Sequence, residues 1–412
     1  MEIEELEALE GEPEDGAEDE VDTPHARPSN AAASDSEIDT QFSEQPFRVV
    51  YQTNNFLLPQ LSSLILDGDV LNIRPEYQRR LRWANSQKSL LIESLLLNVP
   101  VPPVFFFENE LARYEVMDGQ QRINAIKEFL NNEFVLRGLS ILSSLNGRRY
   151  NKLPPKIKRS LDRASISAIV VLQESQGKLK RAGTGRYYEL RRFVFERLNT
   201  GGRRLNAQEI RNAIYGSPFN NLVTELARNL TFTTIWGIPP YVSADPSEYY
   251  EDPARQKNTM YRLMIDCQLV LRFFALREEK HIQGSMRSML DKCMERHMDD
   301  TEADIEALRE EFVGRLTLAN ELFDGSPFRL PDVKGRSRPV AGIYDAVMVA
   351  LDRLWAGRAS LLANKDAVMQ AYREVVRSEG HSGSLTGAAN TSNDIKRRLQ
   401  LVYNAFEPLA RG

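Results

Sequence analysis

The spacing of apolar residues changes along the chain and predicts two kinds of structure. Apolar residues recur every three or four positions in 57–65, which is the period of an amphipathic helix. A second helix is predicted over 86–98, ended by the prolines at positions 100, 102 and 103. Two short apolar runs, Val104–Phe107 and Tyr114–Met117, flank a polar turn and predict a β-hairpin. The second run leads directly into 123–131, whose apolar residues share one helical face. The first part of the folded chain is therefore predicted to be α/β.

Beyond residue 257 the pattern is mainly helical. Apolar stripes with helical spacing cover 260–274 and 305–316. Two more helices are predicted at 341–356 and 363–377. Together these stripes predict a helical bundle as a second domain, so the expected fold class is an α/β domain followed by a mainly α-helical C-terminal domain.

Charge is distributed unevenly over the 412 residues. Residues 1–46 hold sixteen Asp and Glu against one Arg, a net charge of −15, and the rest of the chain carries +10. The acidic segment has one aromatic residue and too few apolar side chains to offset the entropy of ordering, which predicts disorder. Residues 137–211 hold eighteen Lys and Arg against five acidic residues. This basic excess predicts a polyanionic partner. The expected domains are a disordered acidic tail at 1–46, an α/β domain at 47–230 and a helical domain at 231–412.

Several classes of protein are disfavoured. The two cysteines, Cys267 and Cys293, lie too far apart in sequence for a CxxC zinc pair and are too few for a disulfide framework. The longest apolar runs fall well short of the ~20 residues of a membrane span. The first residues, Met-Glu-Ile-Glu-Glu, lack the basic and apolar regions of a secretory signal. We expect a cytoplasmic protein with no membrane partner.

The most informative motif is the junction at Asp118–Arg122, where a strand passes through a glycine turn into a helix. The first backbone N–H groups of such a helix point outward with the positive end of its dipole, and this favours a phosphate. Arg122 in the first turn opposes the dipole by about 0.3–1 kcal/mol, a cost that a bound anion would reverse. The alternative is that Asp118 caps the helix and Arg122 pairs with a carboxylate.

A second basic motif lies upstream, in 75–83. Gln78, Arg79 and Arg80 lie between the aromatic residues Tyr77 and Trp83. The arginines are suited to grip phosphates, and the alternative is that they stack on the two rings at a domain surface. Downstream, Asn206 followed by Glu209 predicts a capping box at the start of a helix.

These motifs resemble those of a known family. Five features occur here in order: Tyr77-Gln78-Arg79, the Leu-rich helix 90–97, Pro102-Pro103, Asp118-Gly119-Gln120-Gln121-Arg122, and Phe195-Glu196-Arg197-Leu198-Asn199-Thr200-Gly201-Gly202 followed by Leu205, Glu209 and Arg211. The stretch 48–230 thereby resembles the N-terminal domain of GmrSD-type modification-dependent restriction enzymes. The resemblance implies a ParB/sulfiredoxin-like fold, nucleotide binding at the turn, and a role in defence against foreign DNA.

The resemblance also implies roles for single residues. Gly119 would allow close approach of the nucleotide, Gln120 and Gln121 would donate hydrogen bonds, and Gln78, Arg79, Arg80 and Arg122 would contact phosphates. Asp118 would be the catalytic residue, as the ligand of Mg²⁺ or the group that orients water. The expected cofactors are a nucleoside triphosphate, whose base the sequence does not identify, and Mg²⁺.

The chain departs from the best-known members, which carry or recruit an HNH nuclease. The four histidines, His25, His281, His297 and His381, lack the nearby partners of a metal site, so autonomous HNH cleavage is not expected. The sequence therefore predicts an NTP-binding protein of a restriction or phage-defence system that couples the nucleotide to DNA or to a partner nuclease in trans, with Mg-dependent NTP hydrolysis left open. The alternatives are a DNA-binding adaptor without turnover and a ParB-like DNA nuclease.

Overall fold

The computed structural model describes residues 34, 36, 39–40, 49–66, 70–73, 83–172, 184–198, 206–240, 252–330, 339–379, 385 and 390–411. Most of the acidic segment 1–46, and the arginine-rich segment 74–82, lie outside these residues. The chain divides into two compact units, and the main division along the sequence falls between Gly202 and Arg203. Each unit is described here by itself.

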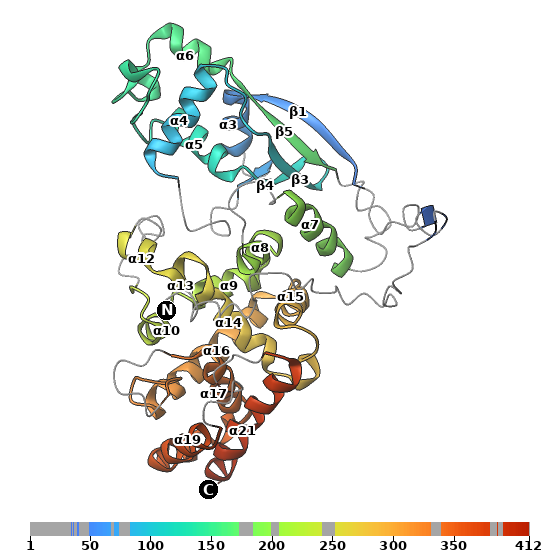
Figure 1. The fold of residues 1–412 in the computed structure, drawn as a ribbon, viewed down its shortest axis with the longest axis vertical. Coiled ribbons are helices and arrows are strands. Elements are labelled where there is room, and N and C mark those ends of the chain that lie inside the picture. Colours follow the sequence, from blue (N-terminus) through green and yellow to red (C-terminus); the bar gives the residue numbers. More distant parts are fainter. Residues whose placement is uncertain are drawn as a thin grey trace. The chain divides into compact units, whose positions relative to one another are not determined.

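The first unit is built on a mixed five-stranded sheet with the strand order β1-β5-β3-β4-β2 (Figure 1). Its central strand β3 runs parallel to β5 and antiparallel to β4, while β1 and β2 pair at the edges. The strands are β1 (Tyr51–Leu57), β2 (Leu71–Asn72), β3 (Val104–Glu110), β4 (Arg113–Asp118) and β5 (Ser165–Val171). The predicted hairpin is confirmed as β3 and β4, although β3 runs three residues further than its apolar run.

Helices cover one face of this sheet over a continuous core. They are α3 (Leu58–Leu66), α4 (Asn85–Leu96), α5 (Gln120–Leu130) and α6 (Pro155–Asp162). Alternate strand residues such as Val104, Phe106 and Val116 pack against Ile123 and Phe129 of α5 because successive strand side chains point to opposite faces. The predicted helices at 57–65, 86–98 and 123–131 are thereby confirmed to within a few residues.

The opposite face of the sheet receives α7 (Thr184–Leu198). Arg191 of α7 forms a buried ion pair with Glu115 of β4, with 2.8 Å between Nη2 and Oε2, and its guanidinium lies 5.3 Å from the ring centroid of Phe107. Removing one member of a buried pair strands the other charge, so this contact fixes α7 on the strand that leads to Asp118.

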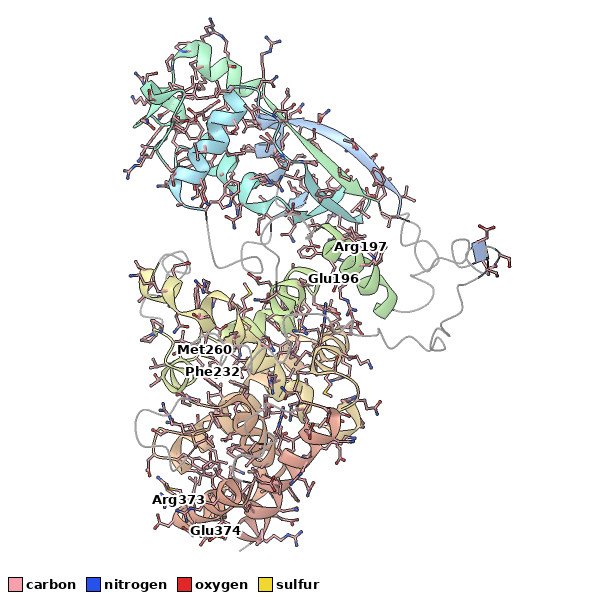
Figure 2. All side chains as sticks on the ribbon, viewed as in Figure 1. Glu196, Arg197, Phe232, Met260, Arg373 and Glu374 are labelled. Atoms are coloured by element: carbon pink, nitrogen blue, oxygen red, sulfur yellow. The ribbon has the colours of Figure 1, made fainter. Side chains whose placement is uncertain are left out.

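The second unit is helical. Its elements are α8 (Ala207–Ile214), α9 (Pro218–Leu226), α10 (Leu230–Trp236), α12 (Pro253–Lys257), α13 (Thr259–Arg262), α14 (Ile265–Leu276), α15 (Met286–Arg296), α16 (Glu302–Leu322), α17 (Ala341–Arg353), α18 (Arg358–Ala363), α19 (Lys365–Glu379) and α21 (Ser392–Ala410). Aromatic rings fill its core, where Phe232 (Figure 2) packs against Trp236 and Phe312. The α/β region followed by a mainly helical one is confirmed.

Two details differ from the sequence-based expectation. The units divide near residue 202, whereas we expected a boundary at 230, because α8 packs on α14 and α15 through the buried ion pair of Arg211 with Asp291 (2.6 Å). The apolar stripe at 260–274 is split into α13 and α14 at Met264, which adopts a left-handed φ of 56°.

None of the helices in the described residues is long and apolar enough to cross a membrane.

Candidate functional site

The candidate site is the junction between β4 and α5. β4 ends at Asp118, Gly119 takes the N-cap position, and α5 begins at Gln120. Gly119 has φ of 91° and ψ of 11°, a left-handed conformation that costs most residues about 1–2 kcal/mol and glycine almost nothing. The strand therefore turns sharply into the helix because position 119 is a glycine.

The surroundings of Gly119 add a second reason for the glycine. A Cβ placed there would lie 2.5 Å from Cγ1 of Val104, a core residue of the neighbouring strand β3. The sequence suggested that Gly119 lets a ligand approach closely. The structure shows a close approach by Val104, a contact that the sequence does not reveal.

Arg122 is the most heavily engaged side chain of the junction. Its Nη2 donates to Oδ2 of Asp118 at 2.8 Å, and its Nη1 donates to the carbonyl oxygens of Pro102 (2.5 Å) and Pro103 (3.2 Å). The side chain of Arg122 is only 13% exposed. Arg122 thus ties the first turn of α5 to the end of β4 and to the proline step that precedes β3.

The sequence left open an alternative in which Asp118 caps the helix and Arg122 pairs with a carboxylate. The contacts of the junction test each of these two roles separately. Arg122 does pair with a carboxylate, that of Asp118, so its charge has a partner within the protein. Asp118 does not cap the helix, because Gly119 is the N-cap and no side chain accepts a hydrogen bond there. The first turn of α5 also contains no acidic residue. The positive end of the helix dipole is therefore left without a side-chain cap, while the carboxylate beside it is 53% exposed.

The two glutamines of the motif lie in different surroundings. Gln120 is 3% exposed, so its side chain belongs to the interior of the first unit. Gln121 is half-buried, and its Oε1 accepts a hydrogen bond from the backbone N–H of Trp83 at 3.2 Å. Gln121 thus anchors the chain immediately after the arginine-rich segment to the start of α5.

The upstream cluster Gln78, Arg79 and Arg80 lies outside the described residues. Its downstream flank is fixed by the contact of Trp83 with Gln121, across 38 residues of sequence. The structure thus brings one end of the upstream motif to the junction, a connection that neither motif predicts alone.

The later family motif has structural roles in the described residues. Glu196 and Arg197, near the end of α7 (Figure 2), interact within their own helix, with Arg192 and with the ring of Phe193. Asn206 and Glu209 form the predicted capping box of α8. Glu196 and Arg197 thus support α7 of the first unit, and Asn206 and Glu209 support α8 of the helical unit.

The buried pair of Arg191 and Glu115 was missed in the sequence. Glu115 also accepts a hydrogen bond from Asn109 Nδ2 at 2.9 Å. The available signal was a carboxylate in an apolar strand, because Glu115 falls between Tyr114 and Val116. Such a residue on a covered face requires a buried cation.

The described residues contain no group of three or more His, Cys, Asp or Glu side chains arranged to hold a metal ion. His297 pairs instead with Asp300 (2.7 Å) and stacks on Phe219. Burial raises the pKa of Cys293 to about 12, so this thiol stays protonated near neutral pH.

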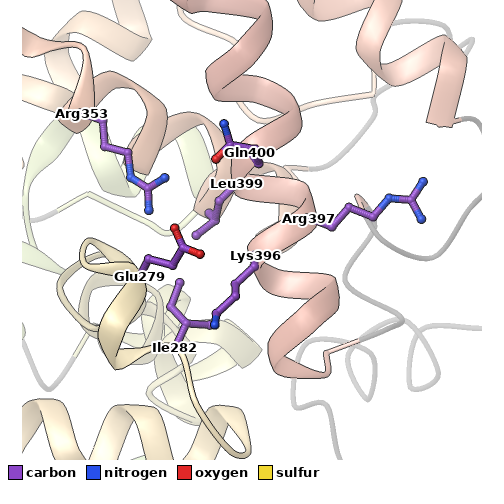
Figure 3. A pocket seen from close by; sticks show the side chains of 7 residues that line it. All are labelled: Glu279, Ile282, Arg353, Lys396, Arg397, Leu399 and Gln400. Carbon is purple, nitrogen blue, oxygen red and sulfur yellow. The ribbon is translucent and has the colours of Figure 1, made fainter.

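A shallow pocket lies in the helical unit beside α17 and α21 (Figure 3). Lys396, Arg353 and Glu279 line it, whereas Arg397 also bonds to Glu379. Its lining holds the cations Arg353, Lys396 and Arg397 beside the single carboxylate Glu279, but it lacks the helix N-terminus that favours phosphate at the β4–α5 junction.

The comparisons with known proteins support the resemblance given by the motifs. The sequence model described as GmrSD restriction endonuclease, N-terminal domain, matches residues 61–216, a range that contains the whole β4–α5 junction. No curated protein and no solved structure matches the chain significantly. Residues 61–216 therefore form a domain of the GmrSD restriction endonuclease N-terminal domain family.

Proposed function

We propose that the β4–α5 junction binds a nucleoside triphosphate together with Mg²⁺. The observation that carries this proposal is the helix N-terminus at Gly119, which has no side-chain cap and has an arginine and an exposed carboxylate beside it. Backbone N–H groups at a helix start donate hydrogen bonds to phosphate oxygens, and the helix dipole adds a favourable field. The family sets the wider context of DNA restriction and phage defence.

The ion pair of Arg122 and Asp118 can open when a nucleotide binds, so that each side chain contacts the ligand in place of the other. A guanidinium carries five N–H donors, so Arg122 can keep the carbonyls of Pro102 and Pro103 while it turns a donor toward a phosphate. Asp118 is then released as an oxygen ligand. Mg²⁺ is commonly held by one or two carboxylates together with substrate phosphates, so a single exposed aspartate fits this ion.

The upstream motif completes the proposed phosphate site. Trp83 is bonded to Gln121, and Arg80 precedes Trp83 by three residues, which span at most about 11 Å. On the resemblance of this motif to the family, Arg79 and Arg80 are assigned to phosphates, with Gln78 as a further hydrogen-bonding group.

The proposed task of the whole protein is to couple its nucleotide state to DNA or to a nuclease supplied in trans. The support is the family, the basic excess in 137–211, and a described helical region without a metal-ligand cluster. Such a protein would meet foreign DNA in the cytoplasm. Whether the nucleotide is hydrolysed is left to experiment.

One observation favours a second function, a DNA-binding adaptor without nucleotide turnover. Arg122 already has three acceptors within the protein, as a purely structural arginine would. Assays of phosphate release with Mg²⁺ separate the two functions. A plasmid-nicking assay under the same conditions tests the ParB-like nuclease.

The proposed function is tested by isothermal titration of the full-length protein with the four ribonucleoside triphosphates in the presence of Mg²⁺. We expect saturable binding of at least one nucleotide. If none of the four nucleotides gives a binding signal at millimolar concentration, the nucleotide proposal is refuted. The DNA-binding adaptor would then be the better account of the protein.

Replacing Arg122 with alanine should weaken nucleotide binding by about 1.5–3 kcal/mol, roughly 10- to 150-fold, because a charge-assisted contact is lost. Lys127→Ala is the matched control, since it removes a cation from the last turn of the same helix. Thermal melting identifies variants that remain folded. A folded Arg122→Ala protein that binds every nucleotide as the wild type does would show that the anion site is elsewhere.

Deleting residues 1–46 should tighten DNA binding at low salt. This segment of net charge −15, predicted from its composition to be disordered, would compete with DNA phosphates for the basic residues of 137–211 at an effective concentration on the order of millimolar. The gain should shrink as salt rises, because both interactions depend on counterion release. Fluorescence anisotropy at two salt concentrations measures it.

The matched control keeps the length of this segment but replaces its Asp and Glu with Asn and Gln. It should bind DNA as tightly as the deletion does. Equal low-salt affinities of the wild type and the deletion would mean that the acidic segment only aids solubility.

A further inference from the structure

The segment between α5 and β5 exposes a dense group of cations. Residues 137–163 contain eight Lys and Arg and a single acidic residue, Asp162. Seven of the cations are exposed and Lys158 is half-buried. We call this group the basic surface; its members are Arg137, Arg148, Arg149, Lys152, Lys156, Lys158, Arg159 and Arg163.

These cations have no ion-pair partner among the described residues of the first unit. Among the described residues, no carboxylate lies within salt-bridge distance of any of the eight. Other arginines from the basic stretch of the sequence do have such partners. Arg191 is buried against Glu115, and Arg211 is buried against Asp291. In the described part of 137–211, the cations without a carboxylate partner are therefore concentrated in 137–163.

The single carboxylate of the segment is occupied by a neutral partner. The hydroxyl of Tyr150 donates to Oδ1 of Asp162 at 2.6 Å. Burial and this hydrogen bond raise the pKa of Tyr150 to about 12, so the hydroxyl remains a donor at neutral pH. Lys158 Nζ lies 4.5 Å from the centroid of the Tyr150 ring. Asp162 thus holds the segment together and forms no ion pair with its cations.

Backbone contacts hold two arginines of the basic surface in place. Arg148 Nη1 donates to the carbonyl of Lys152, and Arg149 Nη1 donates to the carbonyl of Asn132, each at 3.0 Å. The backbone N–H of Asn151 donates to Oδ1 of Asn132 at 2.8 Å. A guanidinium oriented in this way loses less entropy when its remaining donors bind a phosphate.

We infer that the basic surface binds the phosphate backbone of duplex DNA without reading its sequence. Phosphate contacts by Lys and Arg dominate the affinity of such binding. Lys156 also lies in the first turn of α6, which contains no acidic residue, so an anion there would relieve its repulsion by the helix dipole. The choice of DNA rather than another polyanion rests on the proposed function.

The basic surface is separate from the nucleotide site. Asn132, which anchors it, follows the C-terminal end of α5, whereas Gly119 lies at the opposite end. The eleven residues of α5 span about 16 Å. Changes in the basic surface should therefore alter DNA binding without altering nucleotide binding.

The test is the variant Lys152→Glu/Lys156→Glu/Arg159→Glu in the full-length protein, whose affinity for a 20-base-pair duplex is measured by fluorescence anisotropy across a salt series. These side chains are exposed, so the fold should survive, and the corresponding Gln variant serves if it does not. We expect binding at least tenfold weaker at low salt. The slope of log K against log salt should fall by about 2–3, since each phosphate contact contributes roughly 0.9.

A charge-matched control carries Lys257→Glu/Lys292→Glu/Arg373→Glu in the helical unit, where Figure 2 labels Arg373. Equal loss in both variants, or an unchanged slope in the test variant, would overturn the basic surface as the DNA site. Tighter binding to duplex RNA than to duplex DNA would overturn the choice of partner. Nucleotide titration of the wild type and of the test variant distinguishes the two proposals. If the wild type binds no nucleotide but the test variant binds DNA more weakly than the wild type does, only the proposed nucleotide function fails.

Discussion

Replacing Gly119 with alanine is expected to destabilise the first unit by about 2–5 kcal/mol. The left-handed φ of 91° contributes about 1–2 kcal/mol of backbone strain for a residue with a Cβ. The new methyl group would lie 2.5 Å from Cγ1 of Val104, and overpacking of this kind costs about 1–3 kcal/mol. Val104 belongs to the central strand, so the sheet cannot easily move away. Urea denaturation followed by circular dichroism measures the loss.

Gly147→Ala is the matched control for this prediction. Gly147 has a comparable φ of 81°, but nothing lies within 4 Å of the position its Cβ would take. This variant should therefore show only the backbone strain. Equal destabilisation by the two substitutions would mean that the contact with Val104 is unimportant, and that Gly119 is required for its conformation alone.

Asp118→Ala should retain nucleotide binding but lower any NTP hydrolysis by at least ~10²-fold, as expected when a group that holds a metal or positions water is lost. The wild-type rate of phosphate release with Mg²⁺ is the reference. Because Asp118 also accepts a hydrogen bond from Arg122, part of the effect of the alanine could come from a displaced arginine.

Asp118→Asn separates these two causes. Its amide oxygen can still accept the hydrogen bond from Arg122, but it lacks the negative charge that Mg²⁺ favours. Hydrolysis should remain low in this variant if Asp118 acts on the metal or on water. Recovery of the wild-type rate would reduce Asp118 to a positioning partner of Arg122.

The local features of the site were predictable from the sequence. The hairpin, the turn at Gly119 and the start of α5 follow from apolar spacing and from a glycine between a strand and a helix. The capping box of Asn206 and Glu209 was equally visible, because it depends on two residues three positions apart. Such features form from neighbouring residues, so a single sequence contains their signal.

The features that depend on tertiary contacts were not predictable. Arg122 reaches carbonyl oxygens about 20 residues away, and Gly119 is constrained by Val104 on another strand. The ion pair of Arg211 with Asp291 joins residues 80 positions apart and packs α8 on the helical unit. The two units therefore divide near residue 202, whereas the boundary expected from the sequence was residue 230. Hydrophobic spacing carries no information about these partners.

The central claim is that a nucleotide lies on the first turn of α5, and hydrogen–deuterium exchange with a saturating nucleoside triphosphate and Mg²⁺ tests it most directly. The backbone amides of this turn lack intrahelical acceptors and should exchange rapidly in the free protein. Peptides covering 117–124 should become protected when the nucleotide binds, and this protection should be reduced in Arg122→Ala. Protection confined to other peptides, with 117–124 unchanged at saturation, would contradict the account.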